Sequence, residues 1–151
     1  MGSSNDVSER ITNLHAAQRR GIANRPAEAG FPYLAEAMRQ AGVRRNEWQL
    51  PSMQSTYWTQ LGPVVEQGVP LLTGAAEVPS FDEAALIAAL RADQAGRTSF
   101  PEFAAAAWRA GVVRWAIDLE GRVCTYHGCD GEGFVERYAA VALPDAAEES
   151  S

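Results

Sequence analysis

The chain has no lysine, so arginine supplies all thirteen of its basic side chains. It also has no apolar run near the roughly 18 residues that a membrane-spanning helix needs. Its first six residues lack the basic start and the apolar centre of a secretory signal peptide. These absences argue against a membrane protein and predict a cytoplasmic one.

Cysteine is scarce, because Cys124 and Cys129 are the only two. Two neighbouring cysteines do not make the disulfide framework of a small secreted protein. The sequence also lacks a glycine-rich phosphate loop, a Gly-x-Ser-x-Gly elbow and a His-Glu-x-x-His helix. No catalytic motif is recognisable, so the sequence favours a protein without enzymatic activity and predicts no cofactor.

Charge is unevenly distributed along the 151 residues, whose net charge is −6. Residues 1–50 hold seven arginines and five acidic residues, a balance of +2, whereas residues 51–151 hold six arginines and 14 acidic residues, a balance of −8. An acidic protein repels nucleic-acid phosphates. The composition therefore argues against nucleic acid as a partner.

The strongest pattern is an internal repeat. Residues 31–58 align without a gap with residues 100–127, and 11 of the 28 aligned positions are identical. Both segments begin with Phe-Pro, pass through Ala-Gly-Val and contain Thr-Tyr near their ends. Such self-similarity indicates one supersecondary unit used twice. Each half alone would bury little surface, so the two halves are expected to share one core.

Each copy predicts two helices followed by a hairpin. Ser99–Glu102 and Ser80–Glu83 have the Ser-x-x-Glu pattern of a capping box, and residues 112–119 alternate as a half-buried strand does. We predict an α+β fold with an antiparallel sheet and the helices packed on one face. The predicted domain spans residues 6–143, with repeats at about 6–77 and 78–143 and disordered tails at 1–5 and 144–151.

The first copy departs from the pattern of the second. Arg44 and Asn46 stand where the second copy has Val113 and Trp115. These positions belong either to a partly exposed edge or to a surface that faces a ligand or partner. Residues 69–72 are the candidate third strand of the first copy, and Pro70 would place this segment at an edge or make it irregular.

Several segments of the second half resemble a known family. They are Phe100–Phe103, Ala110–Trp115, Asp118-Leu119 and Tyr126–Gly131. They are similar to the YdfO-like domain-of-unknown-function family of bacterial and prophage genomes, whose members are sometimes labelled phage envelope proteins. The resemblance spans about residues 7–143. It implies a compact α+β domain of chromosomal or prophage origin and implies no activity, and the acidic chain without a membrane span does not fit the envelope label.

Aromatic residues and arginines concentrate in the first hairpin. These residue types are enriched at the hot spots of protein interfaces. We therefore predict a surface for a protein partner, which includes a second copy of this chain as one possibility. The predicted surface consists of Arg44, Arg45, Trp48, Tyr57 and Trp58. The alternative is that these aromatic residues belong to the core.

Two other functions are alternatives. A small enzyme or metal-binding protein would use Cys124, His127 and Cys129, because zinc binds thiolates and imidazoles. On a continuing strand, however, Cys124 faces away from the other two, so no metal site is predicted. A nucleic-acid-associated regulator would instead use arginines of the N-terminal part of the chain. Those arginines are Arg19, Arg20, Arg25, Arg44 and Arg45, and Arg114 belongs to the same basic concentration.

Overall fold

One antiparallel sheet of six strands forms the centre of the structure, a computed structural model that describes residues 2–144 and the side chains of residues 9–144. The strands lie side by side in the order β3-β2-β1-β4-β5-β6. Their bounds are β1 (Val43–Gln49), β2 (Gln54–Thr59), β3 (Gly62–Gln67), β4 (Arg114–Asp118), β5 (Val123–His127) and β6 (Gly133–Arg137).

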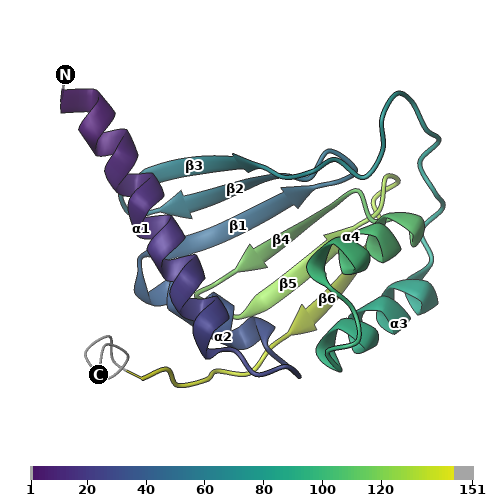
Figure 1. Ribbon diagram of the computed structural model, residues 1–151. Coiled ribbons are helices and arrows are strands. Elements are labelled where there is room, and N and C mark those ends of the chain that lie inside the picture. The colour runs from purple at the N-terminus through teal and green to yellow at the C-terminus, as the bar shows by residue number, and fades with distance from the viewer. Residues whose placement is uncertain (1, 145–151) are drawn as a thin grey trace.

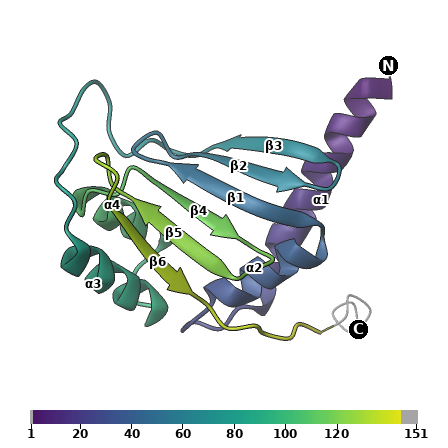
Figure 2. The same ribbon diagram turned by 180° about the vertical axis from the view of Figure 1, so that it is seen from behind.

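The helices of the described chain lie on one face of this sheet (Figure 1). They are α1 (Gly2–Asn24), α2 (Phe31–Gln40), α3 (Glu83–Gln94) and α4 (Phe100–Arg109). α1 packs against α2, and α3 packs against α4. Figure 2 shows the opposite face of the sheet, in front of which no helix lies. The predicted α+β class with helices on one face is therefore confirmed.

An apolar core fills the space between helices and sheet. Leu14 of α1 and Leu86 of α3 are almost completely buried. The alternation predicted for the second copy is confirmed, because Trp115, Ile117 and Leu119 are all buried. No helix among the described residues is both long and apolar enough to cross a membrane.

Side-chain caps start both helices of the second half. The Ser99 hydroxyl accepts from the backbone N–H of Glu102, and the Glu102 carboxylate accepts from the N–H of Ser99 at 2.9 Å, so the predicted capping box is confirmed. The predicted cap of α3 was Ser80, but the structure uses Asp82, which accepts from the N–H of Ala85 at 3.0 Å. The backbone N–H of Asp82 donates to the carbonyl of Ala110, which keeps Asp82 outside the helix.

α1 is longer than the sequence indicates. It begins at Gly2, so residues 2–5 belong to the helix and the start of the predicted domain at residue 6 lies inside it. No proline stands in this stretch to stop a helix. Met1 and residues 145–151, which complete the predicted tails, lie outside the described residues.

The first hairpin differs from its prediction at two places. The register of β1 shifts between Val43 and Arg45, which makes a β-bulge at Arg44. β3 spans residues 62–67, whereas the predicted third strand at 69–72 lies in a loop. The Thr59 hydroxyl donates to the carbonyl of Gly62 at 2.6 Å and so closes a tight turn directly after β2. The chain therefore reverses earlier than the sequence pattern indicates.

The two halves of the chain have the same order of elements, two helices followed by three strands. They meet where β1 pairs with β4, and Glu47 lies opposite Ala116 in that register. These two residues are separated by the offset of the sequence alignment. The same offset separates Met53 and Arg122, which share a positive φ of 62° and 55°. This arrangement supports the internal repeat, which remains a prediction from the sequence.

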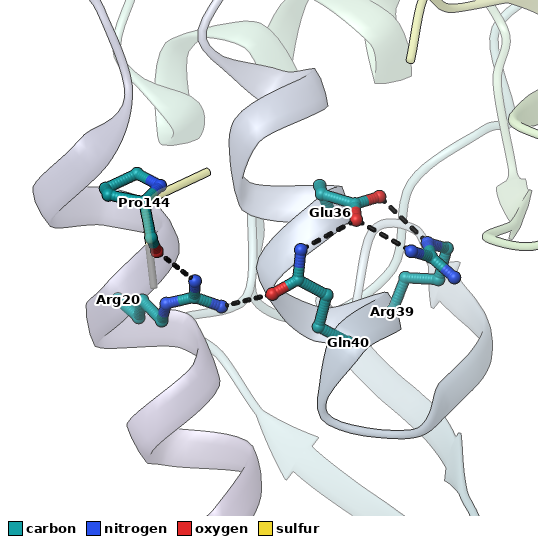
Figure 3. Close-up of polar contacts among 5 residues, drawn as sticks. All are labelled: Arg20, Glu36, Arg39, Gln40 and Pro144. Carbon is teal, nitrogen blue, oxygen red and sulfur yellow. Dashed lines mark hydrogen bonds and ion pairs between the residues drawn. The ribbon is translucent and has the colours of Figure 1, made fainter. Parts of the chain in front are cut away.

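Figure 3 shows how the segment after β6 is held against α1 and α2. Arg20 of α1 donates to the carbonyl oxygen of Pro144 at 2.5 Å and to Oε1 of Gln40 at 2.6 Å. Gln40 donates to Glu36 at 2.9 Å, and Glu36 accepts two further hydrogen bonds from Arg39 at 2.8 and 2.7 Å. Polar side chains thus connect three segments at the end of the described chain.

Candidate protein interface

Arg45 and Trp58 lie next to each other on the face of the sheet that no helix covers. They are opposite each other in the register of β1 and β2. The guanidinium carbon of Arg45 lies 4.9 Å from the centroid of the Trp58 ring, which is the geometry of a cation–π contact. We call this surface the open face. Its outward side chains include Arg45, Glu47, Thr56, Trp58, Val65, Ala116, Asp118, Val123, Thr125 and Val135.

The bulge at Arg44 explains why two successive arginines are exposed. A regular strand sends neighbouring side chains to opposite faces. The extra residue in β1 lets both Arg44 and Arg45 reach solvent and returns Asn46 to the buried side. Arg44 therefore lies at the margin of the open face, and Arg45 lies on it.

Trp48 and Tyr57 lie on the opposite, helix-covered face, so the structure divides the predicted surface. Tyr57 is 5% exposed, and its burial raises its pKa to about 12. The ring of Trp48 packs against Phe100 at 4.9 Å and against Trp115 at 5.8 Å between centroids. Because strand neighbours alternate, Tyr57 and Trp58 cannot share a face. The expected exposure of Trp48 and Tyr57 is therefore corrected: both pack on the core side.

β1 differs from the matching strand of the second copy by a buried polar residue, Asn46. Asn46, which stands where the second copy has Trp115, is 2% exposed. Its Nδ2 donates to the carbonyl of Thr56 at 3.0 Å, and its Oδ1 accepts from Nε1 of Trp48 at 2.9 Å. Asn46 therefore faces the core. Of the residues at which β1 differs from the second copy, Arg44, at the bulge, is exposed to solvent.

Residues that the sequence analysis did not single out extend the open face to both edges of the sheet. Val65 on β3 is 58% exposed, and Val135 on β6 is 57% exposed. Thr56 and Thr125 lie in the same row between them. Period-two alternation, counted from a buried tyrosine in β2 or β5, is the signal that identifies both threonines as outward-facing.

Acidic side chains accompany three arginines of the nucleic-acid alternative, Arg44, Arg45 and Arg114. Nε of Arg44 lies 3.8 Å from a carboxylate oxygen of Glu120. Nη1 of Arg114 lies 3.7 Å from a carboxylate oxygen of Glu47, and Arg45 forms an ion pair with the same carboxylate. Phosphate binding draws on basic charge that is not already neutralised. This arrangement gives no support to the nucleic-acid alternative.

The residues of the metal or enzyme alternative point in different directions. Cys124 is buried beneath the helices, His127 lies across from Arg114 on the other face, and Cys129 is exposed after β5. Burial raises the pKa of Cys124 to about 12, so its thiol is protonated at neutral pH and is a poor nucleophile. Within residues 9–144, no three His, Cys, Asp or Glu side chains gather as ligands for a metal ion.

Comparison with known proteins identifies relatives along most of the chain. Residues 27–136 match the model of a family described as "Protein of unknown function (DUF1398)". An uncharacterized protein of Mycobacterium bovis and uncharacterized proteins of two Mycobacterium tuberculosis strains, CDC 1551 and H37Rv, are similar to the chain. Each is 64% identical over 135 residues, which cover 89% of this chain and 82% of the relative. These descriptions do not mention a phage envelope, so the YdfO-like label and the prophage origin remain predictions.

Proposed function

The chain belongs to the DUF1398 family of proteins of unknown function, and we propose that it is a protein-binding module without catalytic activity. The proposed binding surface is the open face of the sheet. The observation that carries the proposal is the stacking of Arg45 on Trp58 at a sheet face that no described helix covers. Tryptophan and arginine are among the residues that contribute most to binding energy at protein interfaces. The cytoplasmic location expected from the sequence remains part of the proposal.

The composition of the open face supports this proposal. An antiparallel sheet with one face in water usually carries polar residues on that face. Here Trp58, Val65 and Val135 expose apolar surface among charged side chains of the central strands, such as Arg45 and Asp118. Protein interfaces combine apolar with polar area, and aromatic residues and arginine are enriched in them.

Truncation of Trp58 tests the proposal. Tagged wild-type chain, Trp58→Ala and Arg45→Ala are each incubated with a lysate of the native host, and the captured proteins are quantified by mass spectrometry. We expect at least one partner of the wild-type chain to be reduced roughly tenfold or more by each variant, because truncating a hot-spot residue costs about 2 kcal/mol. Circular dichroism confirms that each variant is folded.

Val69→Ala is the matched control for this experiment. Val69 is 86% exposed, but it lies in a loop outside the open face. Its truncation removes exposed apolar surface and is expected to leave capture unchanged. Equal capture by the wild-type chain, Trp58→Ala and Arg45→Ala would exclude the open face as the binding surface.

A further inference from the structure

We infer that the open face binds a second copy of this chain, sheet against sheet. The inference rests on the proposed function, because it names the partner of the same surface. Its starting point is the register of the strands, which aligns outward side chains in rows across the whole sheet. One row is Pro63, Trp58, Arg45, Asp118, Val123 and Arg137. The next row is Val65, Thr56, Glu47, Ala116, Thr125 and Val135.

These rows are complementary to themselves under a two-fold rotation. A second copy turned by half a circle, about an axis parallel to the strands and between β1 and β4, places β1 of one copy over β4 of the other. Arg45 then faces Asp118 of the second copy, because the two residues are level with each other in the β1–β4 register. Every such contact occurs twice, as in the isologous interface of a symmetric dimer.

The same rotation places apolar side chains opposite each other. Trp58 on β2 lies over Val123 on β5 of the second copy, and Val65 on β3 lies over Val135 on β6. Sheets that pack face to face keep their mean strand directions within about 30° of each other. Any such angle displaces the facing pairs least near the axis, at Arg45 and Asp118, and most at the two edges.

The charges near the axis are balanced within each copy. Arg45 forms an ion pair with Glu47, and Arg114 lies 3.7 Å from the same carboxylate. Asp118 supplies a second carboxylate opposite Arg45 in the register. Burying a neutralised set of charges costs less than burying like charges. A second copy also presents the matching pattern by symmetry, which is why we choose it over an unrelated protein.

A shallow depression lies on the open face where the second copy would place its indole ring. It is lined by Arg45, Ala116, Ile117, Asp118, Val123 and Thr125. The rotation that pairs Arg45 with Asp118 brings Trp58 of the second copy over Val123 at the wall of this depression. An aromatic side chain seated in a pocket is a common anchor of protein interfaces.

The size of the open face indicates how tightly two copies would bind. With strands about 4.8 Å apart and about 3.3 Å of length per residue, the sheet offers roughly 500 Å² of plane on each copy. Protruding side chains add accessible surface to this plane. The area buried on both copies together then approaches the lower end of the about 1,200–2,000 Å² that specific interfaces bury. We therefore expect a concentration-dependent dimer with a dissociation constant in roughly the micromolar range.

Charge exchange between Arg45 and Asp118 tests the contact at the axis. Sedimentation velocity of the full chain is measured from about 1 to 200 µM, a range that brackets micromolar association. We expect the wild-type chain to shift from the mass of one chain to that of two. Arg45→Asp and Asp118→Arg should each weaken association at least about tenfold, because like charges then face each other across the axis.

An equimolar mixture of these two variants should restore the dimer. In the mixed pair, both facing contacts again join opposite charges. A purely structural effect of either substitution within its own chain would not be repaired by mixing, so restoration identifies a contact between chains. Trp58→Ala should also weaken association, whereas Val69→Arg, in an exposed loop outside the open face, should leave it unchanged.

A second pair of variants keeps the test decisive if the first pair fails to fold. Val65→Arg and Val135→Glu lie on edge strands at exposed positions, where a charge is compatible with the fold. Each variant alone should weaken self-association. Their mixture should associate more strongly than either one, because one of its two edge contacts then joins opposite charges.

The outcomes separate this inference from the proposed function. A wild-type chain that stays monomeric at about 200 µM overturns the second copy as partner. If Trp58→Ala still abolishes capture of another protein in that case, the proposed function stands with a different partner. A dimer that none of these variants weakens overturns the open face as its interface, and capture indifferent to Trp58 then overturns the proposed function as well.

Discussion

The indole Nε1 of Trp48 donates a hydrogen bond to Oδ1 of Asn46 at 2.9 Å on the helix-covered face of β1. Asn46 also donates to the carbonyl of Thr56 on the neighbouring strand. An unpaired polar group in such a buried place costs free energy, because it loses water without gaining a partner. The indole N–H of Trp48 and both ends of the Asn46 amide are hydrogen-bonded, so β1 can bury an asparagine at the position where β4 has Trp115.

Replacing Asn46 should destabilise the fold. Asn46→Ala removes the acceptor of the Trp48 indole and the donor to Thr56, and we expect the free energy of unfolding to fall by about 2–3 kcal/mol. Urea denaturation followed by circular dichroism measures this change. Trp48→Phe should cost less when Asn46 is already alanine than when it is not, since the two residues share one hydrogen bond.

Gln49→Ala is the control for this pair, because Gln49 lies on the same strand and is exposed. We expect it to change the free energy of unfolding by less than about 0.5 kcal/mol. If Asn46→Ala were no more destabilising than Gln49→Ala, the buried hydrogen bonds would contribute nothing measurable.

Gly42 and Gly111 follow the ends of α2 and α4, and alanine should affect them unequally. Both have a left-handed backbone, with φ of 93° and 89°, so alanine at either position costs about 1 kcal/mol of strain. A Cβ at Gly111 would lie 2.6 Å from the carbonyl oxygen of Ser80, whereas at Gly42 it would meet the side chain of Gln60. A side chain can move aside more easily than a backbone carbonyl.

We therefore expect Gly111→Ala to lower the melting temperature clearly more than Gly42→Ala does. Gly74→Ala isolates the cost of strain, because Gly74 has a φ of 77° and no atom within 4 Å of an added Cβ. Thermal unfolding of the three variants should rank them Gly74, Gly42 and Gly111 in order of increasing loss. Equal losses at Gly42 and Gly111 would contradict the backbone clash.

The second half of the fold was more predictable than the first because its signals are local and periodic. The Ser99 cap and the alternation around Trp115 need only neighbouring residues to be recognised. The bulge at Arg44 and the tight turn closed by Thr59 change the phase and the position of strands in the first half. Neither the bulge nor the turn leaves a periodic pattern in the sequence. The sequence therefore predicts the third strand at 69–72, although β3 spans residues 62–67.

The candidate surface was predictable in position but not in membership. The first hairpin does carry Arg45 and Trp58 on the open face. Tyr57 and Trp58 are neighbours on one strand, so their side chains point to opposite faces of the sheet. This rule is sufficient to show that they do not belong to the same surface. Whether Val65 faces outward depends on where β3 begins and how it pairs with β2. The turn closed by Thr59 determines both, and that turn has no recognisable signal in the sequence.

Glu36→Gln should destabilise the protein in a pH-dependent manner. The hydrogen bonds from Arg39 lower the pKa of Glu36 below its ordinary value of 4.5. A carboxyl group with a lowered pKa stabilises the fold above its unfolded pKa, and this contribution is lost as pH falls through the folded pKa. We expect a loss of about 0.5–1 kcal/mol near pH 7, given the partial exposure of Arg39, and a smaller loss near pH 3.

Glu120→Gln provides the matched control, because the Glu120 side chain is 69% exposed and its ion pair is long. Its carboxylate oxygen lies 3.8 Å from Nε of Arg44. Exposed pairs of this kind contribute little to stability. Urea denaturation near pH 7 should show a change of less than about 0.5 kcal/mol in the free energy of unfolding for this variant. A loss at Glu36→Gln that is equal at neutral and acidic pH would assign its effect to packing instead of charge.

The two cysteines should differ strongly in reactivity. Cys124 is buried and has its pKa raised to about 12, whereas Cys129 is exposed. We expect a thiol reagent to label the folded chain once, at Cys129, and to label it twice in denaturant. Cys129→Ser should therefore remove the fast reaction, while Cys124→Ser should keep it.

The pH dependence of this labelling reports the surroundings of Cys129. Local desolvation and the carboxylates of Asp130 and Glu132 raise its pKa above the ordinary value of 9.0. Since the thiolate is the reactive form, labelling should accelerate as pH rises through neutrality toward that pKa. Asp130→Asn removes one negative charge and should increase the rate at neutral pH. Fast labelling of both thiols in the folded chain would contradict the burial of Cys124 beneath the helices.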